Sequence, residues 1–178
     1  MIECDPMKDK SHGAEPRAPA LELLSDEQLL LLRADLQREM RRRGIAFSVG
    51  EIGEHLVIEH FRTTPGLPKL QKLPRGTKNV DALSRDGDRY SIKTVLNAKK
   101  TGTIYPDTDD KGKQLFEHLV IAQLNQDMTL RSIWLFSWCD FVRVRCWDKR
   151  MSAWYVGVSR TTAARGRIVY PPTAATTA

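Results

Sequence analysis

The sequence is poor in the features that define several protein classes. Its 178 residues include only three cysteines, Cys4, Cys139 and Cys146, and none of them forms a CxxC pair. An odd number of scattered thiols argues against a disulfide scaffold and against structural zinc. No stretch approaches the roughly 20 apolar residues of a membrane helix, and the first residues lack the apolar core of a signal peptide. We therefore expect a cytoplasmic protein with no membrane segment.

Familiar enzyme motifs are also missing. The four histidines, His12, His55, His60 and His118, stand in no HExxH arrangement, so a zinc hydrolase is not expected. Neither a GxxxxGK[ST] loop nor a GxGxxG fingerprint is present. P-loop and dinucleotide-binding enzymes are thereby excluded as first hypotheses.

Positive charge is concentrated in one part of the chain. The formal net charge is +6, and the segment from Arg62 to Lys100 holds ten basic residues against three acidic ones. Such a segment favours a polyanionic partner, because Lys and Arg gain affinity by releasing counterions from phosphates. A solvated face that aids solubility explains the same charge.

The chain reads as one domain, residues 25–170, between flexible tails at 1–24 and 171–178. Its first element is a predicted helix over residues 25–43, capped by Ser25 and Gln28. The apolar positions of this helix share one face: Leu29, Leu32, Leu36 and Met40. That face is explained equally by packing in a core and by a homodimer interface. A weaker alternative makes this helix the centre of an RNA-binding or protein-interaction module.

The remaining pattern predicts an α/β (α+β) domain with a central mixed sheet. We expect a helix over 48–61 whose buried stripe is Val49, Ile52, Leu56 and His60. A hairpin of strands 79–84 and 89–96 follows, then a helix over 113–126. The last predicted elements are strands within 132–138, 141–147 and 153–159.

The register of the predicted hairpin decides which side chains share a face. A two-residue turn would place Asp81 opposite Ile92 and send Lys93 to the other face. A three-residue loop over 85–87, with a left-handed glycine, would place Asp81 opposite Ser91, with Lys93 on the same face. A site that uses both Asp81 and Lys93 requires the second register.

An acid and a lysine on adjacent strands, with a glutamate on the preceding helix, are the residue types that Mg²⁺-dependent phosphodiester hydrolysis needs. The arrangement of Glu54, Asp81 and Lys93 resembles the PD-(D/E)xK superfamily of restriction-endonuclease-like nucleases, in its Mrr-like or small endonuclease-like branch. Ser91 stands where that family carries an acid or glutamine, and the proline of its signature is missing. Either the glutamates compensate for the missing carboxylate, or metal binding is weak, or the site is inactive.

The resemblance implies a restriction-endonuclease-like core and a Mg²⁺-dependent DNA endonuclease, with Mn²⁺ as an alternative cofactor, that serves DNA restriction or defence. It implies that Glu54 and Asp81 bind the metal and that Lys93 assists the attacking water. Ser91 would position a water or support the metal ligands. Three lysines are expected to contact DNA phosphates: Lys78, Lys99 and Lys100. The main alternative is a catalytically silent DNA-binding subunit with the same fold.

Overall fold

The computed structural model describes residues 20–44, 48–74 and 76–171. The chain divides into two compact units, residues 1–43 and 44–178, and each is described by itself. No helix in the described part has the length and apolar character needed to cross a bilayer.

The described part of the first unit consists of two helical elements. A 3-10 turn at Leu21–Leu23 precedes helix α1, Asp26–Arg42. The cap of α1 is reciprocal: Gln28 N donates to Ser25 Oγ at 3.3 Å, and Ser25 N donates to Gln28 Oε1 at 2.8 Å. This confirms the predicted helix and its cap. The predicted tails at 1–24 and 171–178 lie largely outside the described residues.

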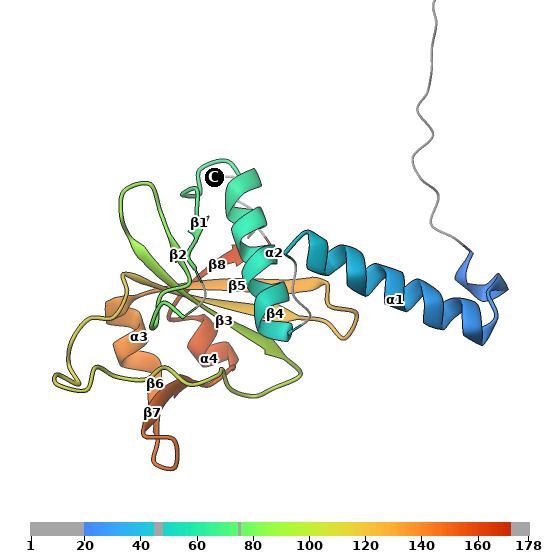
Figure 1. Ribbon diagram of the computed structural model, residues 1–178. Coiled ribbons are helices and arrows are strands. Elements are labelled where there is room, and N and C mark those ends of the chain that lie inside the picture. The colour runs from blue at the N-terminus through green and yellow to red at the C-terminus, as the bar shows by residue number, and fades with distance from the viewer. Residues whose placement is uncertain (1–19, 45–47, 75, 172–178) are drawn as a thin grey trace, which may run out of the picture. The chain divides into compact units, whose positions relative to one another are not determined.

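The second unit is built on a six-stranded mixed sheet, which confirms the expected α/β class (Figure 1). The sheet has the order β1-β2-β3-β4-β5-β8, and its one parallel pair is β3 with β4. Its strands are β1 (Gln71–Lys72), β2 (Ala82–Leu83), β3 (Arg89–Leu96), β4 (His118–Leu124), β5 (Leu130–Ser137) and β8 (Arg167–Tyr170). A separate hairpin consists of β6 (Arg145–Asp148) and β7 (Ala153–Val156).

Helices cover both faces of this sheet, and each face has its own apolar core. Helix α2 (Val49–Thr63) packs on one face, where Val57 and Phe61 join Ile92 in a buried cluster. Helix α3 (Trp138–Val144), the short α4 (Arg160–Ala163) and the β6-β7 hairpin lie on the other face, whose cluster includes Val95 and Phe141. Side chains alternate along β3, so Ile92 and Val95 belong to opposite faces.

The buried face of α2 differs from the prediction. Its buried residues are Gly53, Val57 and Phe61, whereas the expected stripe of Val49, Ile52, Leu56 and His60 is only partly buried. The reason is a close approach at Gly53, where an added Cβ would lie 2.0 Å from Thr94 Oγ1 of β3. Because glycine has no side chain, the backbone of α2 can approach β3 at this point. This contact determines which face of α2 is buried.

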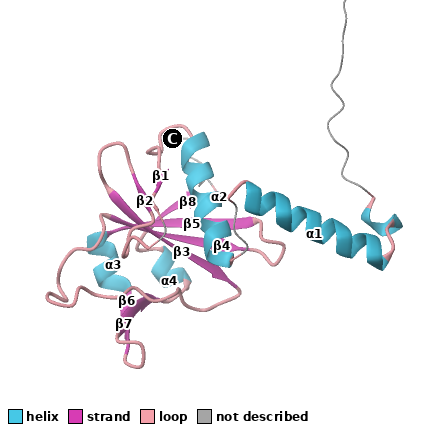
Figure 2. Cartoon of the chain, in the orientation of Figure 1, coloured by secondary structure: helices cyan, strands magenta, loops and turns pink. Residues whose placement is uncertain are grey.

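The predicted helix over 113–126 is wrong, since this segment contains strand β4 instead. Five of the seven residues of β4 are buried, and all seven pair with β3 and β5 in the sheet interior. A strand covered on both faces has a continuous apolar run, and such a run is easily mistaken for a buried helix. A long loop therefore joins β3 to β4 (Figure 2), and the described residues 97–117 contain no helix.

The predicted strand over 141–147 is half wrong. Residues Trp138–Val144 form α3, and only Arg145–Asp148 forms a strand, β6. Ser137 starts the helix because its Oγ accepts a hydrogen bond from Asp140 N at 3.2 Å. The strands predicted within 132–138 and 153–159 correspond to β5 and β7.

An ion pair ties the start of β3 to the residue before β4. Arg89 donates to the Glu117 carboxylate from Nε at 3.0 Å, from Nη2 at 2.8 Å and from its backbone N at 2.7 Å. These bonds from Arg89 lower the pKa of Glu117 to about 2. A depressed carboxyl pKa stabilises the fold above the unfolded pKa, and the contribution is lost as the pH falls towards 2.

Candidate functional site

The β2-β3 hairpin has the bulged register that the candidate site requires. Ala82 pairs with Tyr90 and Leu83 with Arg89, so residues 85–87 form a three-residue loop. Gly87 has φ 90°, and its N donates to Ser84 O at 3.2 Å. Glycine adopts this left-handed conformation without the steric strain that other residues would incur. The prediction of a three-residue loop is confirmed.

Asp81 lies immediately before β2, and hydrogen bonds from β3 hold its carboxylate. Its Oδ2 accepts hydrogen bonds from Ile92 N at 2.6 Å and from Ser91 Oγ at 3.4 Å. No hydrogen bond to Oδ1 occurs in the part of the chain that the structure describes. One carboxylate oxygen is therefore held by the strand, and the other is open to a cation.

The bond from Ile92 N also locates the carboxylate within the sheet. Backbone N–H groups of a strand point along the sheet plane, towards the neighbouring strand. The Asp81 carboxylate therefore lies at an open stretch of the β3 edge, beyond the short β2. A group at this edge can be reached from both faces of the sheet.

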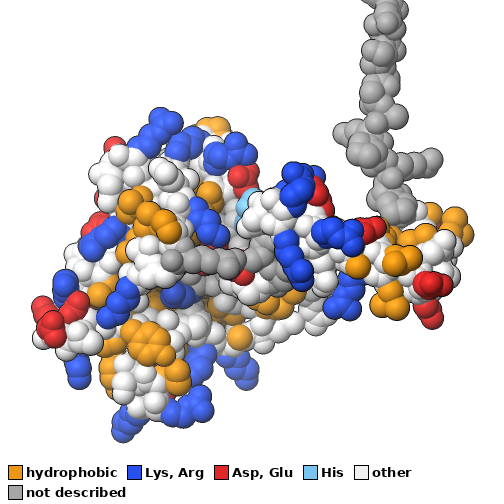
Figure 3. All heavy atoms as spheres, viewed as in Figure 1, with side chains coloured by type: hydrophobic (Ala, Val, Ile, Leu, Met, Phe, Trp, Pro, Cys, Tyr) orange, Lys and Arg blue, Asp and Glu red, His pale blue; other side chains and the backbone are white. Residues whose placement is uncertain are grey.

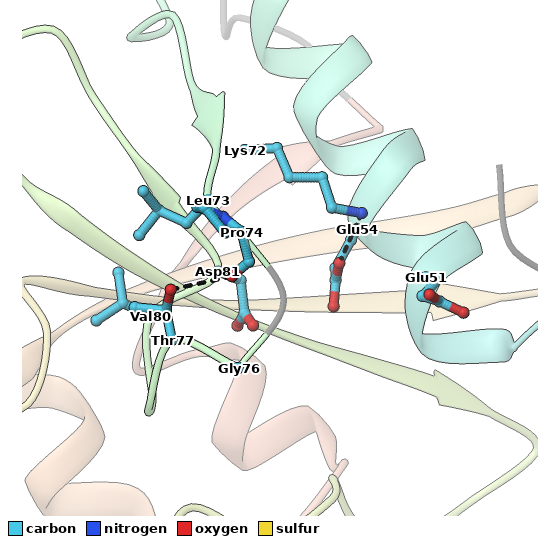
Figure 4. A pocket seen from close by; sticks show the side chains of 9 residues that line it. All are labelled: Glu51, Glu54, Lys72, Leu73, Pro74, Gly76, Thr77, Val80 and Asp81. Atoms are coloured by element: carbon cyan, nitrogen blue, oxygen red, sulfur yellow. Dashed lines mark hydrogen bonds and ion pairs between the residues drawn. The ribbon is translucent and has the colours of Figure 1, made fainter. Parts of the chain in front are cut away.

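Glu54 reaches the same place from α2. Glu54 and Asp81 line one pocket of about 220 Å³, together with Lys72 of β1 (Figure 4). Lys72 Nζ lies 3.2 Å from Glu54 Oε2, and the Glu54 side chain is 22% exposed. Glu51 lines the pocket one turn earlier on α2, and its Oε2 accepts a 2.7 Å hydrogen bond from Ser48 Oγ.

Ser91 and Lys93 lie on the face of β3 that is opposite to α2. Their partners across the parallel pair, Leu119 and Ile121, both belong to the core cluster under α3. Ser91 is fully buried, and its hydroxyl donates to Asp81, so it supports the carboxylate rather than contacting solvent. Lys93 is partly exposed and makes no hydrogen bond or ion pair within the described residues.

Asp81 and Glu54, the expected metal ligands, both line the pocket. The described residues contain no group of three or more His, Cys, Asp or Glu that could hold a metal. Mg²⁺ commonly uses one or two carboxylates, several waters and substrate phosphates, whereas a structural zinc site needs four protein ligands. Asp81 and Glu54 would supply the two carboxylates of such a Mg²⁺ site, but too few ligands for structural zinc.

The three lysines expected to contact DNA have different surroundings. Lys100 Nζ pairs with Asp148 Oδ2 at 3.1 Å and lies 4.7 Å from the centre of the Tyr155 ring. The hydrogen bond from Lys100 lowers the pKa of Asp148. Lys78 and Lys99 are exposed and have no such partner in the described part of the chain. Figure 3 shows Lys and Arg side chains recurring over the visible face of residues 44–178.

Lys72 is a charged pocket residue that the sequence did not single out. It lies on a two-residue strand in a Pro- and Lys-rich connector, and no local pattern indicates its contact with Glu54.

Comparison with protein-family models gave no match, and comparison with curated proteins gave none either.

Proposed function

We propose that this chain is a Mg²⁺-dependent nuclease that cleaves DNA, a role consistent with restriction or defence, and that its fold is a variant of the restriction-endonuclease-like core. The observation that carries the proposal is the meeting of Asp81 and Glu54 in one pocket, with Ser91 bonded to Asp81. The net positive segment from Arg62 to Lys100 contains Asp81 and Ser91 and supports a phosphate backbone as the partner.

In this proposal the carboxylates of Asp81 and Glu54 would hold Mg²⁺, which would stabilise negative charge on the phosphoryl oxygens and lower the pKa of a water. Ser91 and Ile92 N hold Asp81 in position through its other oxygen. Lys93 does not line this pocket and lies on the face of β3 that is opposite to α2. In this proposal it approaches the phosphate from that face and offsets the negative charge that develops there.

A second candidate function is that of a DNA-binding subunit without catalysis. The observation that favours it is the Lys72–Glu54 ion pair, because an ammonium group within 3.2 Å of Glu54 competes with a metal for this carboxylate. Ser91 adds no negative charge at the position where a second strand acid would stand. The two functions differ in whether metal binding displaces Lys72.

Lys93→Met is expected to slow cleavage by about 100-fold or more, because one charged donor at a phosphoryl transition state contributes on that order. Lys72→Met is the matched variant, and it is expected to retain cleavage and to lower the Mg²⁺ concentration needed for half-maximal rate. Plasmid nicking across a Mg²⁺ titration measures both effects, with thermal melting to check folding. Loss of activity in Lys72→Met but not in Lys93→Met would make Lys72 the catalytic lysine and contradict the assignment.

A further inference from the structure

A second pocket lies where the parallel strands β3 and β4 end. Leu96 and Leu124 are paired as the last residues of these strands, and the pocket beyond them has a volume of about 450 Å³. Such volumes are typical of small-molecule sites, which span roughly 300–1,000 Å³. In open α/β sheets, ligands bind outside the carboxyl ends of parallel strands.

The wall of this pocket combines an apolar surface with unpaired positive charge. Val95, Trp134 and Ile168 give it apolar area, and the Ile168 side chain is 42% exposed. Three cationic side chains line it, Lys99, Arg131 and Arg160, and no acidic residue does.

The three cations have no anionic partner among the described residues. Some exposed cations of the same unit are paired, as Lys113 is with Asp107 and Arg143 with Asp140, so the pocket differs in gathering three cations without an acid. Three free cations around an apolar hollow match a ligand with a flat apolar body and flanking negative charges. A nucleotide has this chemistry.

The pocket lies on the face of β3 that also carries Lys93. Val95 is two residues beyond Lys93 and four beyond Ser91, which is about 13 Å along the strand. This distance corresponds to about four nucleotides of B-form rise, and to fewer in an extended strand. Resting on the proposed function, we propose that this pocket receives an unstacked base of the nucleic acid strand near the cleaved bond, while Lys99, Arg131 and Arg160 hold the adjacent phosphates.

The test compares two single-stranded tetranucleotides with equal phosphate counts, one with 2-aminopurine and one with an abasic site at the same position. Binding is measured in EDTA, so no cleavage is needed. The base-containing strand is expected to bind roughly 5- to 100-fold more tightly, the contribution of one buried, stacked base. Ala98→Trp, at an exposed residue of the pocket, should abolish this preference and leave the abasic affinity unchanged.

Met151→Trp places the same indole at the β6-β7 turn and is expected to leave the preference intact. Joint Arg131→Ala and Arg160→Ala substitution should weaken both strands equally. Equal affinity of the two strands for the wild type, or a preference that survives Ala98→Trp, would overturn the base pocket. Because the assay contains no metal, a chain that fails to cleave DNA and still prefers the base supports the pocket while refuting the nuclease.

Discussion

Asp81→Asn is expected to abolish Mg²⁺-dependent cleavage while leaving the fold nearly as stable as the wild type. The amide keeps an oxygen that accepts the hydrogen bonds from Ile92 N and Ser91 Oγ, but it removes the negative charge that binds the cation. Loss of one such electrostatic contribution reduces phosphoryl-transfer rates by about 10²- to 10³-fold.

Asp81→Ala separates the two roles of this side chain. It should lose cleavage to the same degree, and it should also lower the free energy of unfolding by about 1–3 kcal/mol. The cost arises because the buried Ser91 hydroxyl and the Ile92 N–H lose their acceptor. Plasmid cleavage and denaturant unfolding of both variants measure the two effects. An Asn variant that cleaves like the wild type would remove Asp81 from the metal site.

Gly53→Ala is expected to be the most damaging single methyl addition in α2. The new Cβ would lie 2.0, 2.4 and 2.7 Å from three atoms of the Thr94 side chain, so the helix must move off β3. Overpacking typically costs about 1–3 kcal/mol, and this contact is tight enough to reach the upper value. Glu54 is the next residue, so the displacement should also impair cleavage.

Gly50→Ala is the matched control, since its Cβ would have only Ser48 Oγ as a neighbour, at 4.0 Å. It should leave cleavage intact and raise stability by about 0.5–1 kcal/mol, the helix propensity of Ala over Gly. Combining Gly53→Ala with Thr94→Gly should restore part of the stability that Gly53→Ala loses. Equal urea midpoints for the two alanine variants would show that α2 does not approach β3 so closely.

The features that local chemistry determines could be predicted from the sequence. Asp86-Gly87 predicted the turn between the two strands, and Gly87 has the left-handed conformation, but the local pattern allowed both loop lengths. The three-residue loop was predicted because a site that uses Asp81 and Lys93 requires it. The cap of α1 depends on Ser25 and Gln28 alone. In each case the interacting groups are close in sequence, so no knowledge of the tertiary fold is needed.

The features that depend on contacts between distant segments were missed. β4 looked helical because its apolar run is continuous and because β3, its parallel partner, is separated from it by residues 97–117. The buried face of α2 was misjudged because Gly53 meets Thr94, a residue 41 positions later. Lys72 was passed over for the same reason, since its link to Glu54 joins a short strand to a helix.

Incubation of the wild-type protein with supercoiled plasmid in Mg²⁺ or in EDTA tests the proposed nuclease most directly, with Glu54→Gln as the matched variant. Glu54→Gln keeps the size and hydrogen-bonding capacity of the side chain but removes the charge that pairs with Lys72 and that would hold the metal. The account predicts nicked or linear DNA with Mg²⁺ alone, and a rate reduced at least tenfold in the variant. DNA that is bound with measurable affinity but stays supercoiled in Mg²⁺ and in Mn²⁺ would contradict it and favour the non-catalytic subunit.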